Sequence, residues 1–276
     1  MIHVLTIHWH SDAWIDIQLK YLNKFIEEPF RVYAFLNNVP NTESHRNKFY
    51  YTSIENIKSH PIKLNLLADI ASFAAEDGRD YLLFLDGDAF PISSITKFKN
   101  KTFCDHKLAA IQRTENNGDI QPHPCFCMTT VDFWNQIKGD WKAGEVVWKD
   151  TFGKEVGDVG GQMLKILENE NWYKLNRSNH HDLHTLLFGI YDELIYHHCA
   201  AFRRPGTRVD QNQVNDYEDR LLKFRKAKQY MPRWLARKLF SPLKYELKKN
   251  QKNSDEIYRS IQDDFYFYKK LETKHD

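Results

Sequence analysis

The sequence has few cysteines for its length. It holds four in 276 residues, at Cys104, Cys125, Cys127 and Cys199, which fits a reducing cytoplasm better than a disulfide framework. The chain also starts without the apolar stretch of a signal peptide, so we expect a cytoplasmic location. The Cys-Phe-Cys triplet is too tightly spaced for a zinc ribbon, and we interpret the cysteines as small apolar residues.

Long apolar runs are absent as well. No run approaches the roughly 20 residues that span a bilayer, so any membrane contact is expected to be peripheral, on the inner face of the cell membrane. There is no internal repeat and no low-complexity segment. The 42% apolar fraction is enough for one main core with a smaller appendage.

The net charge of +2 hides an uneven distribution. Between Arg220 and Lys252, twelve lysines and arginines accompany a single acid, Glu246. The remainder of the chain is therefore acidic on balance, and the C-terminal region is basic.

Strand and helix patterns alternate at the start of the chain. An apolar strand is expected at 3–9, a helix over 11–28 capped by Ser11 or Asp12, and a second strand at 31–38. Strand, helix and strand in this order predict a right-handed βαβ unit with parallel strands.

The next pair of elements leads to a short acidic motif. A helix is expected over 63–78 with Gly78 as its stop, followed by the unbroken apolar strand 81–85. Such a strand is typical of the centre of a parallel sheet, buried on both faces. Open α/β sheets bind ligands outside the carboxyl ends of their strands, which is where Asp86 and Asp88 follow.

Later elements are less regular. We expect strands at 107–113, at 125–134 (running into a short helix) and at 193–203, a helix at 158–170, and long polar helices from about Asn215. We place a boundary between 206 and 215, which divides the chain into a catalytic domain, 1–210, and a helical extension, 211–276.

Asp86, Gly87 and Asp88 suggest a cation site. Two close carboxylates repel unless a cation or a proton lies between them, and hard carboxylate oxygens bind Mg²⁺ or Mn²⁺. The glycine leaves room for a diphosphate or ribose to approach the backbone. A pair of solvated turn aspartates is the ordinary alternative, and the position after a buried strand favours function.

With these pieces in place, the sequence resembles the GT-A glycosyltransferases over roughly residues 1–205. The matching segments are HVLTIHWHSDAWIDIQLKYL, KLNLLADIASF, FLDGDAFPI, GDVGGQML and LIYHHCAAFR. The resemblance implies an α/β fold with a Rossmann-like, mixed, mostly parallel sheet flanked by helices. It also implies transfer from a UDP-, GDP- or dTDP-sugar, with Mn²⁺ or Mg²⁺, to a saccharide or lipid-linked saccharide in surface polysaccharide or lipopolysaccharide synthesis.

The resemblance also implies roles for individual residues. Asp88 would bind the metal directly and Asp86 the metal or a ribose, with His197 or His198 as a further metal ligand. Only one of these two histidines should face inward, because neighbours on a strand point to opposite sides. A satisfied core residue is the alternative for either histidine. The positions implied for the nucleobase, ribose or phosphates are Thr6, His8, Asp12, Asn37, Lys63, Asn65 and Gly87, each with an ordinary alternative as a cap, turn or solvated residue.

Asp158 is the candidate general base for the acceptor hydroxyl. Family members usually carry a Glu-Asp pair here, and this chain has Gly157-Asp158, so the stereochemistry is left open. A helix N-cap is the alternative for Asp158. His123, Trp141 and Trp148 are expected on the acceptor side, with burial in the core as the alternative for the tryptophans.

Other functions fit these residues less well. A haloacid-dehalogenase-type phosphatase also uses Asp-x-Asp after a strand, but it places the motif on the first strand and follows it with Thr or Val. A nucleotidyltransferase would need a Gly-rich basic loop near the start, which is missing. A scaffold that binds nucleic acid through the basic tail lacks a reader motif, and we expect no nucleic-acid partner. The aromatic residues among these bases instead suit an anionic membrane surface, or packing on the catalytic domain.

Overall fold

A computed structural model describes most of the protein. The described residues are 1–116, 118–150, 153, 155–179, 187–199, 214–240 and 242–271, without the side chains of 214–221 and 242–250. They form two compact units, one built mainly from Met1–Asn179 with Gly189–His197 and the other from His180–Phe188 with His198–Lys274. The boundary expected between 206 and 215 lies outside the described residues, apart from the first two positions of a helix at 214–215.

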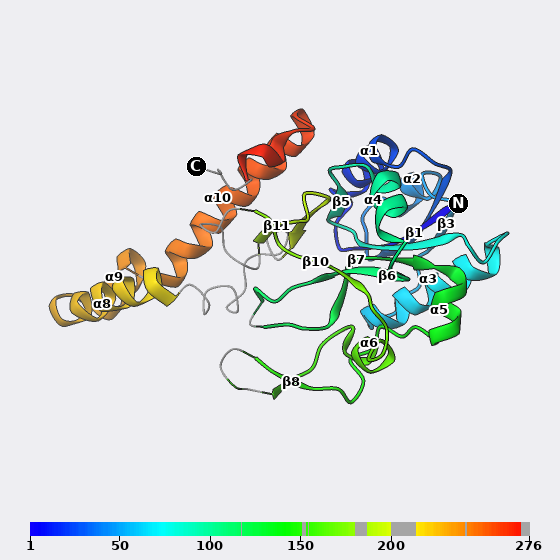
Figure 1. The fold of residues 1–276 in the computed structure, drawn as a ribbon. Helices are drawn as coiled ribbons and strands as arrows, with labels where there is room; N and C mark the ends of the chain where they lie inside the picture. Colours follow the sequence, from blue (N-terminus) through cyan, green and yellow to red (C-terminus); the bar gives the residue numbers. More distant parts are fainter. Residues whose placement is uncertain are drawn as a thin grey trace. The chain divides into compact units, whose positions relative to one another are not determined.

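The elements alternate between strands and helices in the first unit and become helical toward the C-terminus (Figure 1). In chain order they are β1 (Ile2–Trp9), α1 (Ile15–Phe25), β2 (Phe30–Asn37), α2 (Thr42–Arg46), β3 (Tyr51–Ser53), α3 (His60–Ala74), β4 (Tyr81–Asp86), β5 (Ala89–Pro91), α4 (Ile95–Thr102), β6 (Leu108–Gln112), β7 (Pro122–Thr130), α5 (Val131–Ile137), β8 (Trp148–Lys149), β9 (Glu155–Val156), α6 (Gly161–Ile166), β10 (Tyr173–Leu175), β11 (Leu187–Tyr191), β12 (Ile195–Cys199), α8 (Val214–Tyr230), α9 (Arg233–Phe240), α10 (Pro242–Asp263) and the 3₁₀-helix η2 (Phe267–Lys270).

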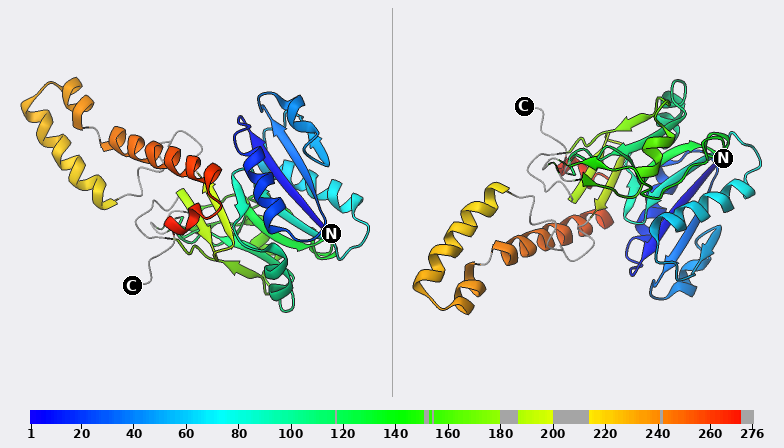
Figure 2. Two further views of the ribbon diagram at one scale, coloured as in Figure 1. Left: turned by 90° about the horizontal axis from the view of Figure 1, so that it is seen from above. Right: turned by 90° about the horizontal axis from the view of Figure 1, so that it is seen from below.

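A seven-stranded sheet organises the first unit (Figures 1 and 2). Its strand order is β10-β6-β7-β4-β1-β2-β3. The strands β1, β2, β3 and β4 run parallel, and β7 runs antiparallel to both β4 and β6. The sheet is therefore mixed and mostly parallel, and β4 is its central strand, as the sequence predicted.

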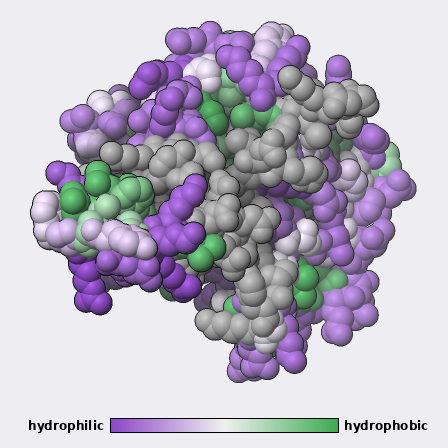
Figure 3. All heavy atoms as spheres, turned by 90° about the vertical axis from the view of Figure 1, so that its left-hand side faces the viewer, coloured by the Kyte–Doolittle hydropathy of each residue, from purple (hydrophilic) through white to green (hydrophobic). Residues whose placement is uncertain are grey.

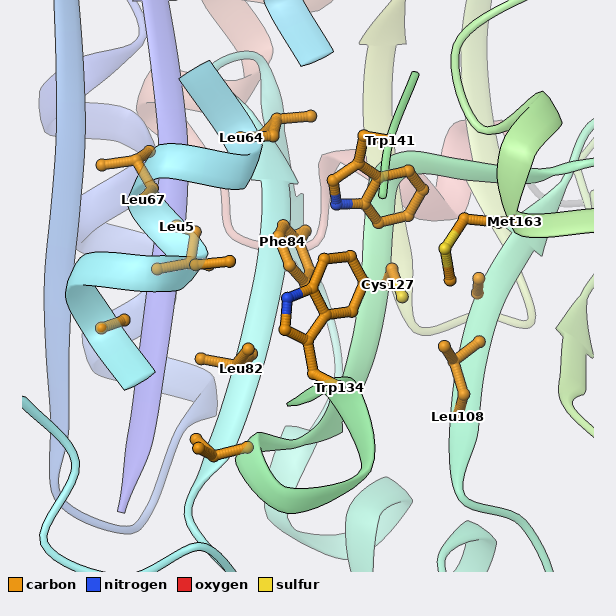
Figure 4. Packing of buried hydrophobic residues seen from close by; sticks show 14 of the residues in the cluster. Leu5, Leu64, Leu67, Leu82, Phe84, Leu108, Cys127, Trp134, Trp141 and Met163 are labelled. Carbon is orange, nitrogen blue, oxygen red and sulfur yellow. The ribbon is translucent and has the colours of Figure 1, made fainter. Parts of the chain in front are cut away.

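Alternation along β4 builds a core on each face of the sheet. Leu82 and Phe84 pack into one cluster with residues of α3 and α5 (Figure 4), while Leu83 and Leu85 pack into another with residues of α1 and α4. Both faces of the strand are buried because helices cover both sides, which explains its unbroken apolar sequence.

Two tryptophans considered for the acceptor side are buried, and one of them packs against Phe84 of β4. Trp141 is fully buried, with its ring stacked on Trp134 at 5.8 Å and edge-on to Phe84 at 5.1 Å. Trp148 is buried as well. The burial of both tryptophans agrees with the core alternative stated for them.

Helix boundaries differ from the predictions at several ends. The N-cap of α1 is Trp14, and Ser11 instead accepts a hydrogen bond from the backbone N–H of Ala13. Helix α3 ends at Ala74, four residues before Gly78. Gly78 lies so close to Asp132 that a Cβ atom at position 78 would collide with that side chain. The short elements α2, β3 and α4 were not predicted, because they span too few residues to show a period.

Candidate metal and donor site

The strand order reverses direction between β1 and β4. The chain runs from β1 outward through β2 to β3 and then returns to β4 on the other side of β1. Ligands of open α/β sheets bind at such a reversal, outside the carboxyl ends of the strands. The register pairs Ile7 with Asp86, so the acidic motif and His8 lie together at this edge.

Three side chains converge there. Strand β12 pairs antiparallel with β5 and sets His197 opposite Ala89, next to the acidic motif. The Nε2 atom of His197 lies 3.4 Å from Oδ2 of Asp86 and 3.3 Å from Oδ1 of Asp88. One ligand atom from each residue can be chosen so that all three lie within 4.8 Å of one another.

This cluster has the composition of a divalent metal site. In the described part of the chain it is the one group of three or more such side chains that could hold a metal ion. The Oδ2 atom of Asp88 is buried and accepts no hydrogen bond from any described residue, which leaves it available to a cation. Two carboxylates and an imidazole suit Mn²⁺ or Mg²⁺, with the nitrogen ligand favouring the former.

Gln18 of α1 fixes the turn that carries the two aspartates. Its side chain is fully buried, and Nε2 donates to the backbone carbonyls of Asp86, at 2.8 Å, and of Ala89, at 2.7 Å. Sequence reasoning missed this residue. The signal was present, because Gln18 is a polar residue within the otherwise apolar stripe of α1.

Gly87 allows the same turn to pack on β1. A Cβ atom there would lie 2.6 Å from the carbonyl oxygen of Ile7 and 2.8 Å from Nδ1 of His8. The glycine is therefore required by the close approach to the end of β1, whatever ligand also approaches it.

His60, at the start of α3, is a second residue that the sequence did not indicate. Its Nε2 atom lies 3.5 Å from Oδ1 of Asp86, on the oxygen that does not face His197. Burial alone would raise the pKa of Asp86, but the contact and charge of His60, with the charge of His197, hold it well below its usual range. Asp86 is therefore ionised. The sequence predicted that the helix begins at 63, three residues after His60.

His123 lies behind the cluster. Its ring centroid is 6.4 Å from that of His197, and its Nδ1 atom accepts the backbone N–H of Cys125 at 3.1 Å. Burial, followed by the charge of Arg113, lowers the pKa of His123 well below its ordinary value. The imidazole of His123 is therefore neutral, and it packs beside His197.

The two neighbouring histidines of β12 have different surroundings. His197 joins the aspartates, whereas His198 meets Oγ of Ser254 through Nε2 at 2.9 Å and packs edge-on against Phe188 at 5.2 Å. Strand alternation places them on opposite faces. The described geometry thus gives His197 to the candidate metal site and His198 to a buried contact.

Residues at the ends of β1 and β2 extend the polar edge. Burial lowers the pKa of His8 to about 4, so its ring is neutral. Lys63 is buried and donates to Oδ1 of Asn37 at 2.8 Å, and burial lowers its pKa. Asp12 lies 3.5 Å from His45. Thr6 is buried within the sheet, three positions before Trp9, which is the last residue of β1 that pairs with β2.

Asn65 and Asp158 occupy other surroundings. Asn65 donates to Asp140 at 2.6 Å and accepts the backbone N–H of Trp141 at 3.1 Å, so both ends of its amide hold the segment that contains these two residues.

Asp158 is exposed, and its side chain accepts the N–H of Val159. The N-cap of α6 is Gly160, so Asp158 is not the cap residue of this helix.

Comparisons with known proteins give structural neighbours alone. No family model matches the sequence. No curated protein matches it either. Among solved structures, a fragment of Staphylococcus aureus TarS is 14% identical (TM-score 0.37) over 51% of this chain and 50% of its own. The galactosyltransferase LgtC, solved with donor and acceptor sugar analogues, is 12% identical (TM-score 0.39) over 63% of this chain and 73% of its own.

A third neighbour is the glycosyltransferase GlyE of Streptococcus pneumoniae. It is 13% identical, with a TM-score of 0.42, over 63% of this chain and 44% of its own. The TarS fragment has also been solved in complex with UDP. This chain spans about half of the TarS fragment, and at these identities a function has to be argued from the residues of the site.

Proposed function

We propose that this protein is a metal-dependent glycosyltransferase that moves a sugar, a hexose in the first instance, from a nucleotide-diphosphate donor to a saccharide or lipid-linked saccharide. The observation that carries the proposal is the convergence of Asp86, Asp88 and His197 at the sheet edge between β1 and β4. Two ionisable carboxylates beside an imidazole, at the place where α/β sheets bind nucleotides, suit a cation and a diphosphate together.

Two sets of residues would act at the donor diphosphate, one that binds the metal ion and one that positions Asp86. Asp86, Asp88 and His197 would hold Mn²⁺ or Mg²⁺, while Gln18 and His60 keep the carboxylate of Asp86 in place. The bound ion would supply Lewis-acid stabilisation of the charge that develops on the departing diphosphate.

The edge formed by β1 and β2 would hold the nucleoside. The neutral ring of His8 offers a donor or an acceptor, and its Nε2 atom has no hydrogen-bond partner among the described residues. Asn37 and Lys63 form a buried polar pair beside it. This pair can bind a base or ribose oxygen by rearranging one hydrogen bond.

At the acceptor, Asp158 would act as the general base in an inverting reaction. The acceptor oxygen forms a bond to the anomeric carbon, the bond from that carbon to the diphosphate oxygen breaks, and the hydroxyl proton passes to the carboxylate. Asp158 is exposed and precedes Gly160, which packs tightly on the carbonyl of Pro122, next to His123. Asp158 is therefore linked through Gly160 and Pro122 to His123, beside the metal cluster, which supports an acceptor bound near these residues.

The test is binding and turnover with a panel of UDP-, GDP- and dTDP-sugars, each with and without Mn²⁺. One donor should stabilise the protein against heat only when metal is present, by roughly 2.7 kcal/mol at a hundred times its dissociation constant. Asp88→Ala should lose this effect, while Asp69→Ala, on the exposed face of α3, should keep it.

Two results would contradict the proposal. One is equal stabilisation of wild type and Asp88→Ala by the metal-bound donor. The other is metal-dependent hydrolysis of p-nitrophenyl phosphate with no response to any nucleotide sugar, which would indicate a phosphatase. If transfer is found, lipid-linked acceptors should then be compared with free saccharides, because we place the enzyme in surface polysaccharide or lipopolysaccharide synthesis on the cytoplasmic side.

A further inference from the structure

The second unit presents large apolar side chains to solvent at the end formed by α8 and α9. We call residues 222–240 the basic tip. Its exposed apolar residues, with the exposed fraction of each, are Leu222 (52%), Tyr230 (86%), Trp234 (67%), Leu239 (59%) and Phe240 (41%). Figure 3 shows a patch of hydrophobic atoms bordered by hydrophilic ones at its left edge. Gathered exposed apolar residues usually mark an interaction surface.

The same segment carries charge of a single sign. No Asp or Glu occurs between 222 and 240. The exposed bases of the tip are Lys223, Arg225, Lys226, Lys228, Arg233, Arg237 and Lys238. A surface that is both apolar and uniformly positive matches a partner with a negative face and an apolar interior.

Local structure holds these side chains in a folded arrangement. Pro232 lies between α8 and α9, and its carbonyl accepts the N–H groups of Leu235 and Ala236 at 3.0 Å each. Ala236 is fully buried, so α9 packs on its neighbours through this side. Trp234 and Leu239 of the same helix remain exposed. No helix in the described part of the chain is long and apolar enough to cross a membrane.

We propose that the basic tip docks the protein on the surface of an anionic lipid bilayer. The exposed rings and leucines would enter the interface, and the arginines and lysines would meet the lipid phosphates. Nucleic acid would satisfy the bases, but it would leave aliphatic Leu222 and Leu239 in water. The proposal concerns the second unit and does not depend on the proposed transferase activity.

The first experiment measures co-sedimentation of the full-length protein with vesicles. We compare phosphatidylcholine vesicles with vesicles that also contain about 30% phosphatidylglycerol, at salt concentrations of about 50 mM and about 500 mM. Binding to the anionic vesicles should be at least about tenfold tighter, and high salt should remove most of the difference. Equal and negligible binding to both kinds of vesicle at low salt would overturn the proposal.

Matched charge variants locate the surface. The triple change Arg233→Gln, Arg237→Gln and Lys238→Gln should weaken binding to anionic vesicles by about tenfold or more. The control is Lys97→Gln, Lys101→Gln and Lys149→Gln, which removes the same charge from exposed positions of the first unit. Equal weakening by both triples would show a nonspecific effect of net charge and would overturn the assignment to the tip.

Apolar variants distinguish a bilayer from a polyanion. Tryptophan fluorescence should shift to the blue on vesicle binding, and Trp234→Phe should remove that shift while binding persists. Leu239→Ser should weaken vesicle binding and leave any binding to a duplex oligonucleotide unchanged. Tighter binding to the oligonucleotide than to anionic vesicles, with no fluorescence shift on the vesicles, would show that the tip binds nucleic acid instead.

Discussion

Asp88→Asn should change the stability of the protein in opposite directions with and without metal. The substitution keeps the shape of the side chain and removes one of two close carboxylates. With ligand atoms within 4.8 Å of one another, two unit charges repel by about 3 kcal/mol at an effective dielectric constant of about 20. The contact of Asp88 with Nε2 of His197, at 3.3 Å, offsets part of this repulsion.

We therefore expect the metal-free variant to be more stable than the metal-free wild type by about 1–2 kcal/mol, or about 3–6 °C in Tm for a chain of this size. Saturating Mn²⁺ should reverse the order, because the wild type gains roughly 2.7 kcal/mol at a hundred times its dissociation constant and the variant has lost a ligand. Thermal unfolding followed by circular dichroism, in EDTA and in Mn²⁺, measures both differences.

The control for this experiment is Asp69→Asn, which removes an exposed carboxylate of α3. It should leave Tm nearly unchanged in both buffers. A variant of Asp88 that is less stable than wild type in EDTA would refute the repulsion argument. Equal gains in Tm from Mn²⁺ for wild type and Asp88→Asn would refute the metal site.

Four further predictions concern the residues around the cluster. Folded His8 has a pKa of about 4, below the 6.5 of an unfolded imidazole, so the unfolded chain binds more protons between these values. The free energy of unfolding should then fall by up to about 3 kcal/mol as pH drops from about 6.5 to about 4, and pH-dependent denaturation of His8→Gln should lack this component. Gln18→Leu leaves two buried carbonyls without a donor and should destabilise the protein by about 2–4 kcal/mol in urea titrations, whereas Asn23→Leu, exposed on the same helix, should change stability by less than about 0.5 kcal/mol. His60→Gln should weaken Mn²⁺ binding about tenfold by calorimetry without altering the fold; unchanged affinity would remove His60 from the site. Asp158→Asn should keep donor affinity and lower kcat by on the order of 10² to 10⁴, and a fall in Tm with full activity would show a structural role instead.

The parts of the fold that could be read from the sequence are those with a local signature. The apolar run ending in Asp86 and Asp88 predicted a central strand and its polar edge, because burial on both faces leaves no polar position within the strand. Trp141 had no such signature. Its place in the core depends on a loop that returns to Phe84 from a distant part of the chain, and the pattern around it is the same for a core or a surface tryptophan.

The supporting residues of the site were missed for a related reason. Gln18 and His60 act through contacts with a turn that lies far from them in sequence, and no periodicity encodes such a pair. The choice between His197 and His198 depends on the register of β12 against β5, where a shift of one residue exchanges the two faces. Sequence patterns predict that a strand forms far better than they predict its register.

The pairing of β12 with β5 also has a consequence for how the protein folds. His197 and Asp88 are separated by more than a hundred residues, and only three paired positions, Ile195–Pro91, Tyr196–Phe90 and His197–Ala89, join the two strands. Closing so long a loop loses chain entropy before any contact compensates for it. We therefore expect the three side chains of the candidate metal site to come together late in folding, and a cation bound among them would close that loop. A nascent chain that has not yet reached residue 197 would carry both carboxylates without the histidine, so metal binding would report that β12 has paired with β5.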